Sequence, residues 1–196
     1  MMKILLENPD VTKAVELTSH GFVQPITDEL IADVEAHIRG DLVMRILDNE
    51  HDVGFATFEV HDELLYLCGI MLDPTAQGRS YAREAIHYAR KITNTRYLGL
   101  RTQNPKMWAV GRRLCEVWLP DVQAEKPDSE MQQVIDLLKI KRNLPHPLDL
   151  GCYGEPLYGA KPEHQDPAIQ RWWDEMCNFE RGDGIVCVGR LNPTHR

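Results

Sequence analysis

The spacing of apolar positions over the first 72 residues predicts a short strand, two helices and then three strands joined by tight turns. The strands are predicted at 3–6, 42–47, 53–60 and 64–72, and the helices at 9–17 and 28–39. Thr27 is a candidate N-cap of the second helix, and Gly40 follows its last apolar position. The polar segments 48–52 and 61–63 are typical of hairpin turns. This order predicts strands paired as hairpins, with helices packed beside them.

The pattern continues with five further elements and one long insertion. These elements are a helix over 83–90, a strand over 95–103, a helix after Asn104, and strands over 117–122 and 185–191. Pro105 separates the second of them from the third, because proline cannot extend a ladder and is favoured at the start of a helix. The last two strands are predicted to pair, and the segment 121–183 between them is predicted to be an insertion. Its parts are an amphipathic helix at 129–141, a loop rich in proline and glycine at 145–162, and a helix at 167–179.

The turn from the apolar strand at 64–72 into the next helix carries the clearest chemical signal. A strand, a loop of small residues and a helix bring several unpaired backbone N–H groups to the positive end of a helix dipole. This arrangement suits a phosphate group. Gly78 lets a ligand approach the backbone closely, and Arg79 adds a cationic side chain. The sequence therefore predicts an anion-binding loop at 77–82.

Residues 77–82, Gln-Gly-Arg-Ser-Tyr-Ala, resemble the pyrophosphate loop of the GNAT acetyltransferase superfamily. The pattern of that loop is Arg or Gln, two residues, Gly, one residue, and Gly or Ala. Ser80 departs from the pattern, because it stands where the family usually has its central glycine. The order of strand, loop, helix, strand, Asn104 and helix also resembles that of the superfamily. Another kind of phosphate-binding α/β protein is disfavoured, since the chain has neither a Walker-type Lys-Ser/Thr nor a Rossmann glycine triplet.

The resemblance implies an α/β (α+β) GNAT fold. Such a fold has a central mixed, mainly antiparallel twisted sheet, splayed at the cofactor site and flanked by helices, here with a helical insertion before the last strand. It implies a single domain over 1–196 with 121–183 as an insertion or appendage. The implied function is an N-acetyltransferase that moves an acetyl group from acetyl-CoA, its co-substrate, directly to an amine.

The resemblance also implies a set of cofactor-binding residues. They are Ile70, Met71, Leu72, Gln77, Gly78, Arg79, Ser80, Tyr81, Ala82 and Asn104. The first three residues pair with the pantetheine amides through their backbone, as an added strand would. Asn104 hydrogen-bonds the pantetheine arm.

The acid–base half of the site departs from the family pattern. The helix after Asn104 often carries a tyrosine that protonates the CoA sulfur, and here its place falls at or near Gly111. The central strand also lacks the glutamate that some members use as a base. The candidates for catalysis are Tyr66, Glu59 and Glu63, although the first is equally typical of a half-buried core and the others of solvated turns. A second interpretation stays open: a catalytically silent GNAT-fold module that acts in regulation or protein interaction.

Composition and charge narrow the range of partners. The 196 residues carry a net charge of −8, which disfavours nucleic acid and favours a cationic acceptor, an amine on a small molecule or a protein. No apolar run is long enough to cross a membrane, and the N-terminus lacks the features of a secretory signal. Five scattered cysteines have neither disulfide-framework nor metal-ligand spacing, and Cys68 and Cys187 are expected to pack in core strands. We therefore expect a cytoplasmic protein with no metal and no nucleic-acid or membrane partner.

The insertion at 121–183 is expected to form the acceptor side of the site, because specificity within a shared fold resides in appended loops. It carries Tyr153, Tyr158, Trp172 and Trp173. Neighbouring helical residues point about 100° apart, so the two indoles cannot both be buried on one narrow face. One indole is expected at an edge, where it is available to a ligand or to the second subunit of a homodimer.

Overall fold

The computed structural model describes residues 1–123 and 126–193 and divides into two compact units. Unit 1 is Met1–Asn94 and unit 2 is Thr95–Arg196. Each unit has antiparallel strands and helices packed on them, so the predicted mixed α/β class is confirmed. The single domain over 1–196 stays a prediction, and the predicted insertion at 121–183 includes residues 124–125, which lie outside the described residues.

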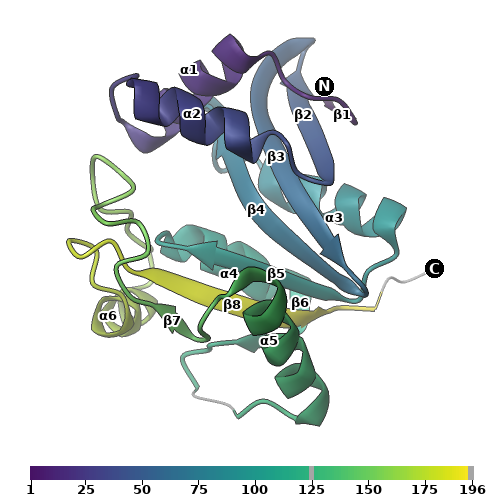
Figure 1. The fold of residues 1–196 in the computed structure, drawn as a ribbon, viewed down its shortest axis with the longest axis vertical. Coiled ribbons are helices and arrows are strands. Elements are labelled where there is room, and N and C mark those ends of the chain that lie inside the picture. Colours follow the sequence, from purple (N-terminus) through teal and green to yellow (C-terminus); the bar gives the residue numbers. More distant parts are fainter. Residues whose placement is uncertain (124–125, 194–196) are drawn as a thin grey trace. The chain divides into compact units, whose positions relative to one another are not determined.

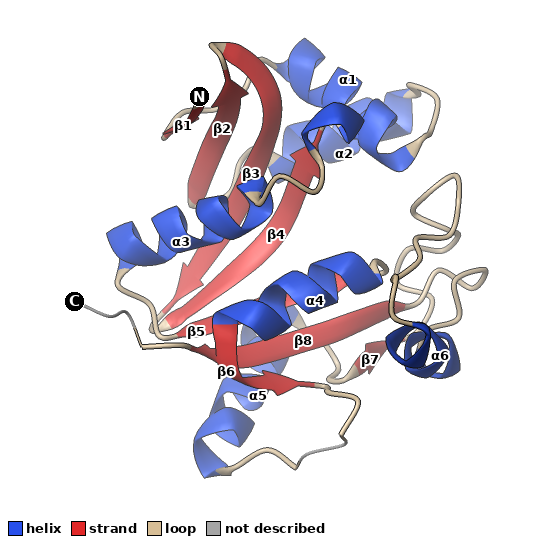
Figure 2. Ribbon diagram, turned by 180° about the vertical axis from the view of Figure 1, so that it is seen from behind, coloured by secondary structure: helices blue, strands red, loops and turns tan. Residues whose placement is uncertain are grey.

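Unit 1 contains four antiparallel strands with helices on both faces (Figure 1). Its elements are β1 (Met2–Leu5), α1 (Val11–Phe22), α2 (Asp28–His37), β2 (Leu42–Asp48), β3 (His51–His61), β4 (Leu64–Leu72), the 3₁₀ turn η1 (Pro74–Ala76) and α3 (Tyr81–Thr93). The strands are hydrogen-bonded in the order β1-β2-β3-β4. Helices α1 and α2 cover one face of these strands and α3 covers the other (Figure 2). The predicted order of elements in this half of the chain is confirmed.

Polar side chains mark the beginnings of the first two helices. The Asp10 carboxylate accepts a hydrogen bond from the Lys13 N–H at 3.0 Å, and the Thr27 hydroxyl accepts one from the Leu30 N–H at 3.2 Å. The N-cap predicted at Thr27 is therefore confirmed. α1 runs beyond the predicted end at residue 17, because its apolar face continues to the buried Phe22.

The turn between β2 and β3 is shorter than the sequence predicts. Asp48 pairs with His51, so only Asn49 and Glu50 connect the strands, with φ angles of 49° and 65°. Two residues with positive φ make a turn whose twist matches that of the flanking strands. Most of the polar segment 48–52 is therefore strand, because backbone pairing outweighs the weak strand preference of its residues.

Unit 2 is built around β8 (Gly184–Leu191), which lies between antiparallel partners. Its other elements are β5 (Tyr97–Thr102), α4 (Pro105–Leu114), β6 (Cys115–Leu119), α5 (Ser129–Arg142), β7 (Leu148–Asp149) and α6 (Pro167–Met176). β5 pairs with residues 185–190 of β8 and β6 pairs with residues 188–191, so the predicted pairing of the last two strands is confirmed. The two-residue β7 also pairs with β8 and was not predicted. Helices α4 and α5 cover opposite faces of β8 (Figures 1 and 2).

The middle of β8 forms the centre of the unit 2 core. Ile185, Val186, Cys187 and Val188 have no exposed surface, which confirms Cys187 as a packed thiol. Trp108 of α4 is also fully buried, and its indole N–H donates to the Pro120 carbonyl oxygen at 2.8 Å. A buried indole needs such an acceptor, and this bond fixes α4 beside the end of β6. Within the described ranges, no helix is long and apolar enough to span a membrane.

Candidate functional site

The segment from β4 to α3 forms the turn that the sequence predicts as an anion-binding loop. Asp73 caps η1, and its carboxylate accepts a hydrogen bond from the Thr75 N–H at 2.9 Å. The first helical bond of α3 joins the Glu84 N–H to the Ser80 carbonyl oxygen. The N–H groups of residues 81–83 therefore have no acceptor within the helix, and they lie at its positive end. This geometry suits an anionic group such as a diphosphate.

Two residues of the loop have a left-handed backbone. Gly78 has a φ of 76° and Ser80 a φ of 67°. A Cβ atom built on Gly78 meets no heavy atom within 4 Å, so the space beside it is open. Ser80 takes the conformation that glycine adopts without strain, which explains why the related loops usually have glycine at this position.

The strain at Ser80 yields a stability prediction. Ser80→Gly should raise the free energy of unfolding by about 1 kcal/mol, because the serine Cβ is disfavoured at positive φ and its side chain makes no capping bond. Urea unfolding followed by circular dichroism measures the change. Ser80→Ala is the matched control, since it removes the hydroxyl but keeps the Cβ and should leave stability nearly unchanged. A Ser80→Gly protein no more stable than Ser80→Ala would contradict this account.

The polar side chains of the loop are anchored to unit 1. The Gln77 amide donates to the Leu72 carbonyl oxygen at 3.2 Å, and this bond closes the loop onto the end of β4. Arg79 forms an ion pair with Asp48 at 3.1 Å, although its side chain remains more than half exposed. Hydrogen bonds from the amino group of Met1 and from Tyr81 hold the pKa of Asp48 below its usual value. Asp48 therefore stays charged and keeps Arg79 beside the loop.

The burial of β4 changes at residue 68. Residues 64–67 are buried and residues 68–72 are partly exposed. The pairing with β3 shifts at the same place, because Thr57 pairs with Gly69 and Phe58 pairs with Leu67, which leaves the residue between them as a β-bulge. Cys68 occupies the bulge and is half-buried, so the prediction of a packed core thiol is wrong for this residue. The predicted cofactor-pairing residues 70–72 all lie in the partly exposed part of the strand.

The three candidates for catalysis lie on the β3–β4 hairpin. Tyr66 is 3% exposed and is the register partner of Glu59. Glu59 pairs with His61 at 3.0 Å, and Glu63 is an exposed residue of the turn. Tyr66 and Glu59 are thus close together, whereas Glu63 lies in the exposed turn at the end of the hairpin. A catalytic role for any of the three stays a prediction.

In unit 2, Asn104 caps α4. Its side-chain oxygen accepts a hydrogen bond from the Lys106 N–H at 2.9 Å. Asn104 also hydrogen-bonds the hydroxyl of Tyr158, and burial of that hydroxyl raises the pKa of Tyr158 to about 12. The neighbouring Leu157 N–H donates to the Gln103 side-chain oxygen at 2.8 Å. The loop of the predicted insertion is therefore fastened to the turn between β5 and α4.

The position at which related proteins often carry a tyrosine is filled by packing. A Cβ atom on Gly111 would lie 2.2 Å from the Trp118 ring, so no larger residue fits there without moving that ring.

The indole of Trp173 is 2% exposed, whereas Trp172 is only half-buried and contacts the Trp108 ring at 5.0 Å between centroids. The prediction that only one of the adjacent indoles is fully buried is confirmed.

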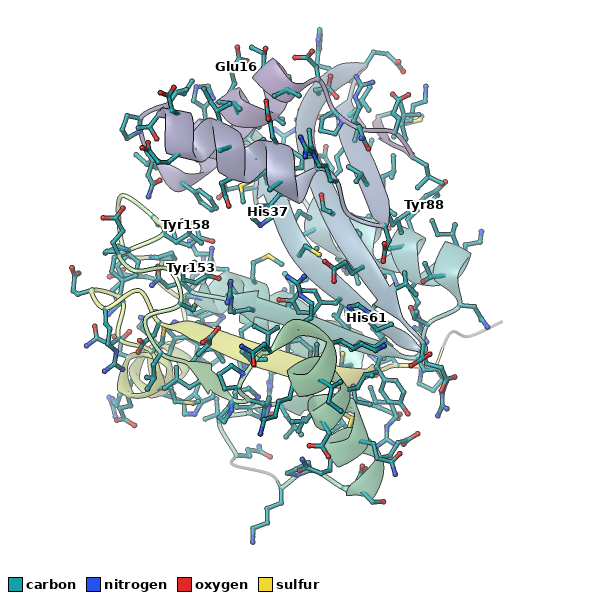
Figure 3. The ribbon with its side chains drawn as sticks, in the orientation of Figure 1. Glu16, His37, His61, Tyr88, Tyr153 and Tyr158 are labelled. Carbon is teal, nitrogen blue, oxygen red and sulfur yellow. The ribbon has the colours of Figure 1, made fainter. Side chains whose placement is uncertain are left out.

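Sequence reasoning missed one polar group on unit 1. His37, the last residue of α2, places its ring beside β4 (Figure 3), where a Cβ atom on Gly69 would lie 3.5 Å from the histidine Cδ2. Its Nδ1 lies 2.9 Å from the Asp33 carbonyl oxygen and 3.3 Å from the Asp33 carboxylate. The spacing of four residues on a predicted helix was a visible signal for the pair, but nothing in the sequence linked it to the strand.

These features define an α/β protein with an anion-binding strand–loop–helix at the end of a partly exposed strand. Residues 12–115 match the family model described as acetyltransferase (GNAT) family. The match covers more than half of the 196 residues, and the chain belongs to this family. No curated protein matches the chain.

Solved structures with the same fold include three acetyltransferases. Aminoglycoside 6'-acetyltransferase type Ii is 7% identical, with a TM-score of 0.55 over 100% of this chain and 99% of that one. A GNAT family acetyltransferase from Elizabethkingia anophelis with acetyl-CoA bound is 10% identical, with a TM-score of 0.52 over 97% and 98%. The ribosomal-protein-S18-alanine N-acetyltransferase from Escherichia coli is 13% identical, with a TM-score of 0.50 over 100% and 97%. At these identities the likeness concerns the fold, and the predicted GNAT fold is confirmed.

Proposed function

We propose that the protein is an N-acetyltransferase that binds acetyl-CoA as co-substrate and transfers its acetyl group directly to an amine. The observation that carries this proposal is the loop at 77–82. Its positive-φ backbone leaves open space beside Gly78, and three N–H groups at the start of α3 have no helical acceptor. Family membership and the acetyl-CoA held by one protein of the same fold support the same conclusion.

The cofactor binds in two parts. The diphosphate accepts hydrogen bonds from the N–H groups at the start of α3, with Arg79 nearby as a cation. The pantetheine amides pair with the backbone of residues 70–72, which lie in the partly exposed end of β4. Asn104 donates one amide hydrogen to the pantetheine arm. This role is compatible with its capping bond, which uses the side-chain oxygen, and with its hydrogen bond to the Tyr158 hydroxyl, which leaves a second amide hydrogen.

The reaction needs a neutral amine beside the thioester carbonyl carbon. The C–N bond forms, the C–S bond breaks, and the amine loses one proton while CoA leaves as a thiolate and then gains one. The protein lowers the barrier by holding both partners in reach and by donating hydrogen bonds to the developing oxyanion. The net charge of −8 favours a cationic acceptor.

A thiol-release assay tests the proposal. The protein is incubated with acetyl-CoA and with amines of three classes. These are small polyamines and aminoglycosides, peptides with a free N-terminal amine, and lysine-containing peptides. Release of free CoA that depends on both protein and amine, with an acetylated product seen by mass spectrometry, is the expected result. Acetyl-CoA binding by calorimetry without turnover on any class would favour a regulatory or protein-interaction module instead.

Asn104 allows its capping and cofactor roles to be separated. Asn104→Asp keeps the oxygen that caps α4 but replaces the amide donor, so the thermal midpoint should stay within a few degrees of wild type. Acetyl-CoA affinity should fall about fivefold, the equivalent of one hydrogen bond of roughly 1 kcal/mol. Asn104→Ala should lower both the thermal midpoint and the acetyl-CoA affinity. Unchanged affinity in both variants, with lower stability in the alanine variant alone, would restrict Asn104 to a cap.

A further inference from the structure

The ring of His37 lies against the one position of the exposed part of β4 that has no side chain. Among residues 68–72 only Gly69 lacks a Cβ, and the His37 Cδ2 is 3.5 Å from where that atom would be. A larger residue at 69 would occupy the space between the ring and the strand. His37 thus reaches the strand backbone itself, at the residue next to the β-bulge.

In the binding mode proposed above, the length of the CoA arm would bring the thioester to the same place. Thirteen bonds separate the inner phosphorus of CoA from its sulfur, which corresponds to roughly 16 Å, or about five residues of a strand at ~3.3 Å each. The partly exposed end of β4 runs over residues 68–72, and η1 separates it from the anion-binding loop, whose Gln77 amide donates to the Leu72 carbonyl oxygen. An arm that begins at the loop and follows this stretch therefore ends at Cys68 and Gly69, beside the His37 ring.

Asp33 sets the tautomer of the His37 ring. The Asp33 carbonyl oxygen, 2.9 Å from His37 Nδ1, can only accept a hydrogen bond, so Nδ1 carries the hydrogen of the neutral imidazole. The lone pair is then on Nε2, on the other side of the ring. The hydrogen bond with His37 holds the pKa of Asp33 below its usual value, so the carboxylate 3.3 Å from Nδ1 stays charged and stabilises the protonated ring.

The same face of β3 and β4 carries a buried hydroxyl that makes no hydrogen bond within the described residues. Thr57 is 1% exposed, and its hydroxyl oxygen makes no hydrogen bond there. Thr57 pairs with Gly69, and opposed residues of antiparallel strands point to the same face. A Cβ atom on Gly40, just after α2, would meet the Thr57 methyl group, which confirms that this is the α2 side. A buried hydroxyl without a partner is a place for a bound water or a polar group of a ligand.

We propose that His37 is the general base of the acetyl transfer and that Asp33 is its positioning residue; the inference rests on the proposed function. The Nε2 lone pair takes a proton from the acceptor amine as its nitrogen attacks the thioester carbonyl carbon. The C–N bond forms, the C–S bond breaks, and CoA leaves as a thiolate. The protonated ring, stabilised by Asp33, then returns its proton to solvent. None of the candidates from the sequence, Tyr66, Glu59 or Glu63, is needed for this step.

His37→Gln and His37→Ala test the proposal in the full-length protein, with the thiol-release assay and calorimetry. His37→Gln should lower kcat about 100-fold, the usual contribution of a general base, with the Kd for acetyl-CoA within twofold of wild type. Added imidazole should restore part of the activity of His37→Ala and should leave the activity of wild type unchanged. Asp33→Asn should lower kcat about tenfold without changing the KM for acetyl-CoA. His87→Gln, at an exposed position of α3, is the control and should behave as wild type.

The outcomes distinguish a failure of the His37 proposal from a failure of the proposed acetyltransferase function. If wild type turns over and His37→Gln keeps kcat within threefold, His37 is not the base and the proposed function stands. If His37→Gln loses acetyl-CoA affinity as much as kcat, the residue acts in binding and the proposal is wrong. If wild type binds acetyl-CoA but acetylates no amine, both the proposed function and the base are overturned.

Discussion

Gly78→Glu should abolish acetyl-CoA binding while the protein remains folded. The new carboxylate would enter the open space beside Gly78, where the proposal places the diphosphate. Like charges brought this close cost several kcal/mol, so the Kd should rise more than about a hundredfold. Isothermal titration calorimetry with acetyl-CoA measures the change, and circular dichroism verifies the fold.

Two controls separate charge from backbone strain. Gly78→Ala introduces the same strain at a φ of 76° without a charge, and it should lose about 1 kcal/mol of stability but retain binding within tenfold. Gly154 has a φ of 73° and equally open surroundings, in a loop of unit 2. Gly154→Glu therefore matches the strain and the charge of the test variant at a position outside the loop at 77–82. Calorimetry that gives Gly78→Glu the same affinity as Gly154→Glu would remove the loop from the cofactor site.

The part of the site that depends on local sequence could be predicted. The loop at 77–82 follows from small residues between an apolar strand and a helix, and the structure has that turn, with no helical acceptor for the first N–H groups of α3. The start of α4 could also be predicted, because Asn104 and Pro105 are strong signals for a cap and a first turn. These interactions join residues only a few positions apart, so the pattern along the chain contains them.

The part of the site that depends on contacts between residues far apart in the sequence could not be predicted. His37 gains its proposed role only because α2 crosses β4 at Gly69, and neither residue is unusual in its own segment. The half-buried state of Cys68 depends on a shift in pairing with β3, which no pattern of apolar residues encodes. The two-residue β7 exists only because β8 offers it a partner. In each case tertiary pairing, and not local preference, decides the outcome.

The hydrogen bonds that hold the insertion could not be predicted from the sequence either. Gln103 is 1% exposed, and its side chain donates to the carbonyl oxygens of Phe179 and Asp183, both at 3.2 Å. Its own oxygen accepts from the Leu157 N–H. One buried glutamine thus joins β5 to two parts of the chain more than fifty positions away, and it fixes the loop that carries Tyr158. The role of this loop toward an acceptor stays a prediction, but its anchoring has a physical cause in hydrogen bonds that burial makes necessary.

Asp183→Asn should be the most destabilising conservative change in this loop region. The Asp183 side chain has no exposed surface, and its two oxygens accept bonds from the Arg181 guanidinium at 2.6 Å each. They also accept from the N–H groups of Gly151 at 2.9 Å and Asn178 at 3.0 Å. An amide nitrogen in place of one oxygen would face these donors, so the free energy of unfolding should fall by about 2–3 kcal/mol.

The loss should depend on pH in a direction that identifies its cause. The Arg181 guanidinium holds the folded-state pKa of Asp183 below its usual value, whereas an unfolded aspartate titrates near pH 3.9. The stabilisation is therefore complete above about pH 4 and is lost as the pH falls through the folded-state pKa. Urea unfolding of wild type and Asp183→Asn should differ most at pH 7, and the difference should shrink below pH 4. Asp174→Asn, which breaks an exposed ion pair with Lys161, is the control and should cost less than about 1 kcal/mol at any pH. A difference between wild type and Asp183→Asn that stays constant down to pH 3 would mean that packing, and not the carboxylate charge, is what Asp183 contributes.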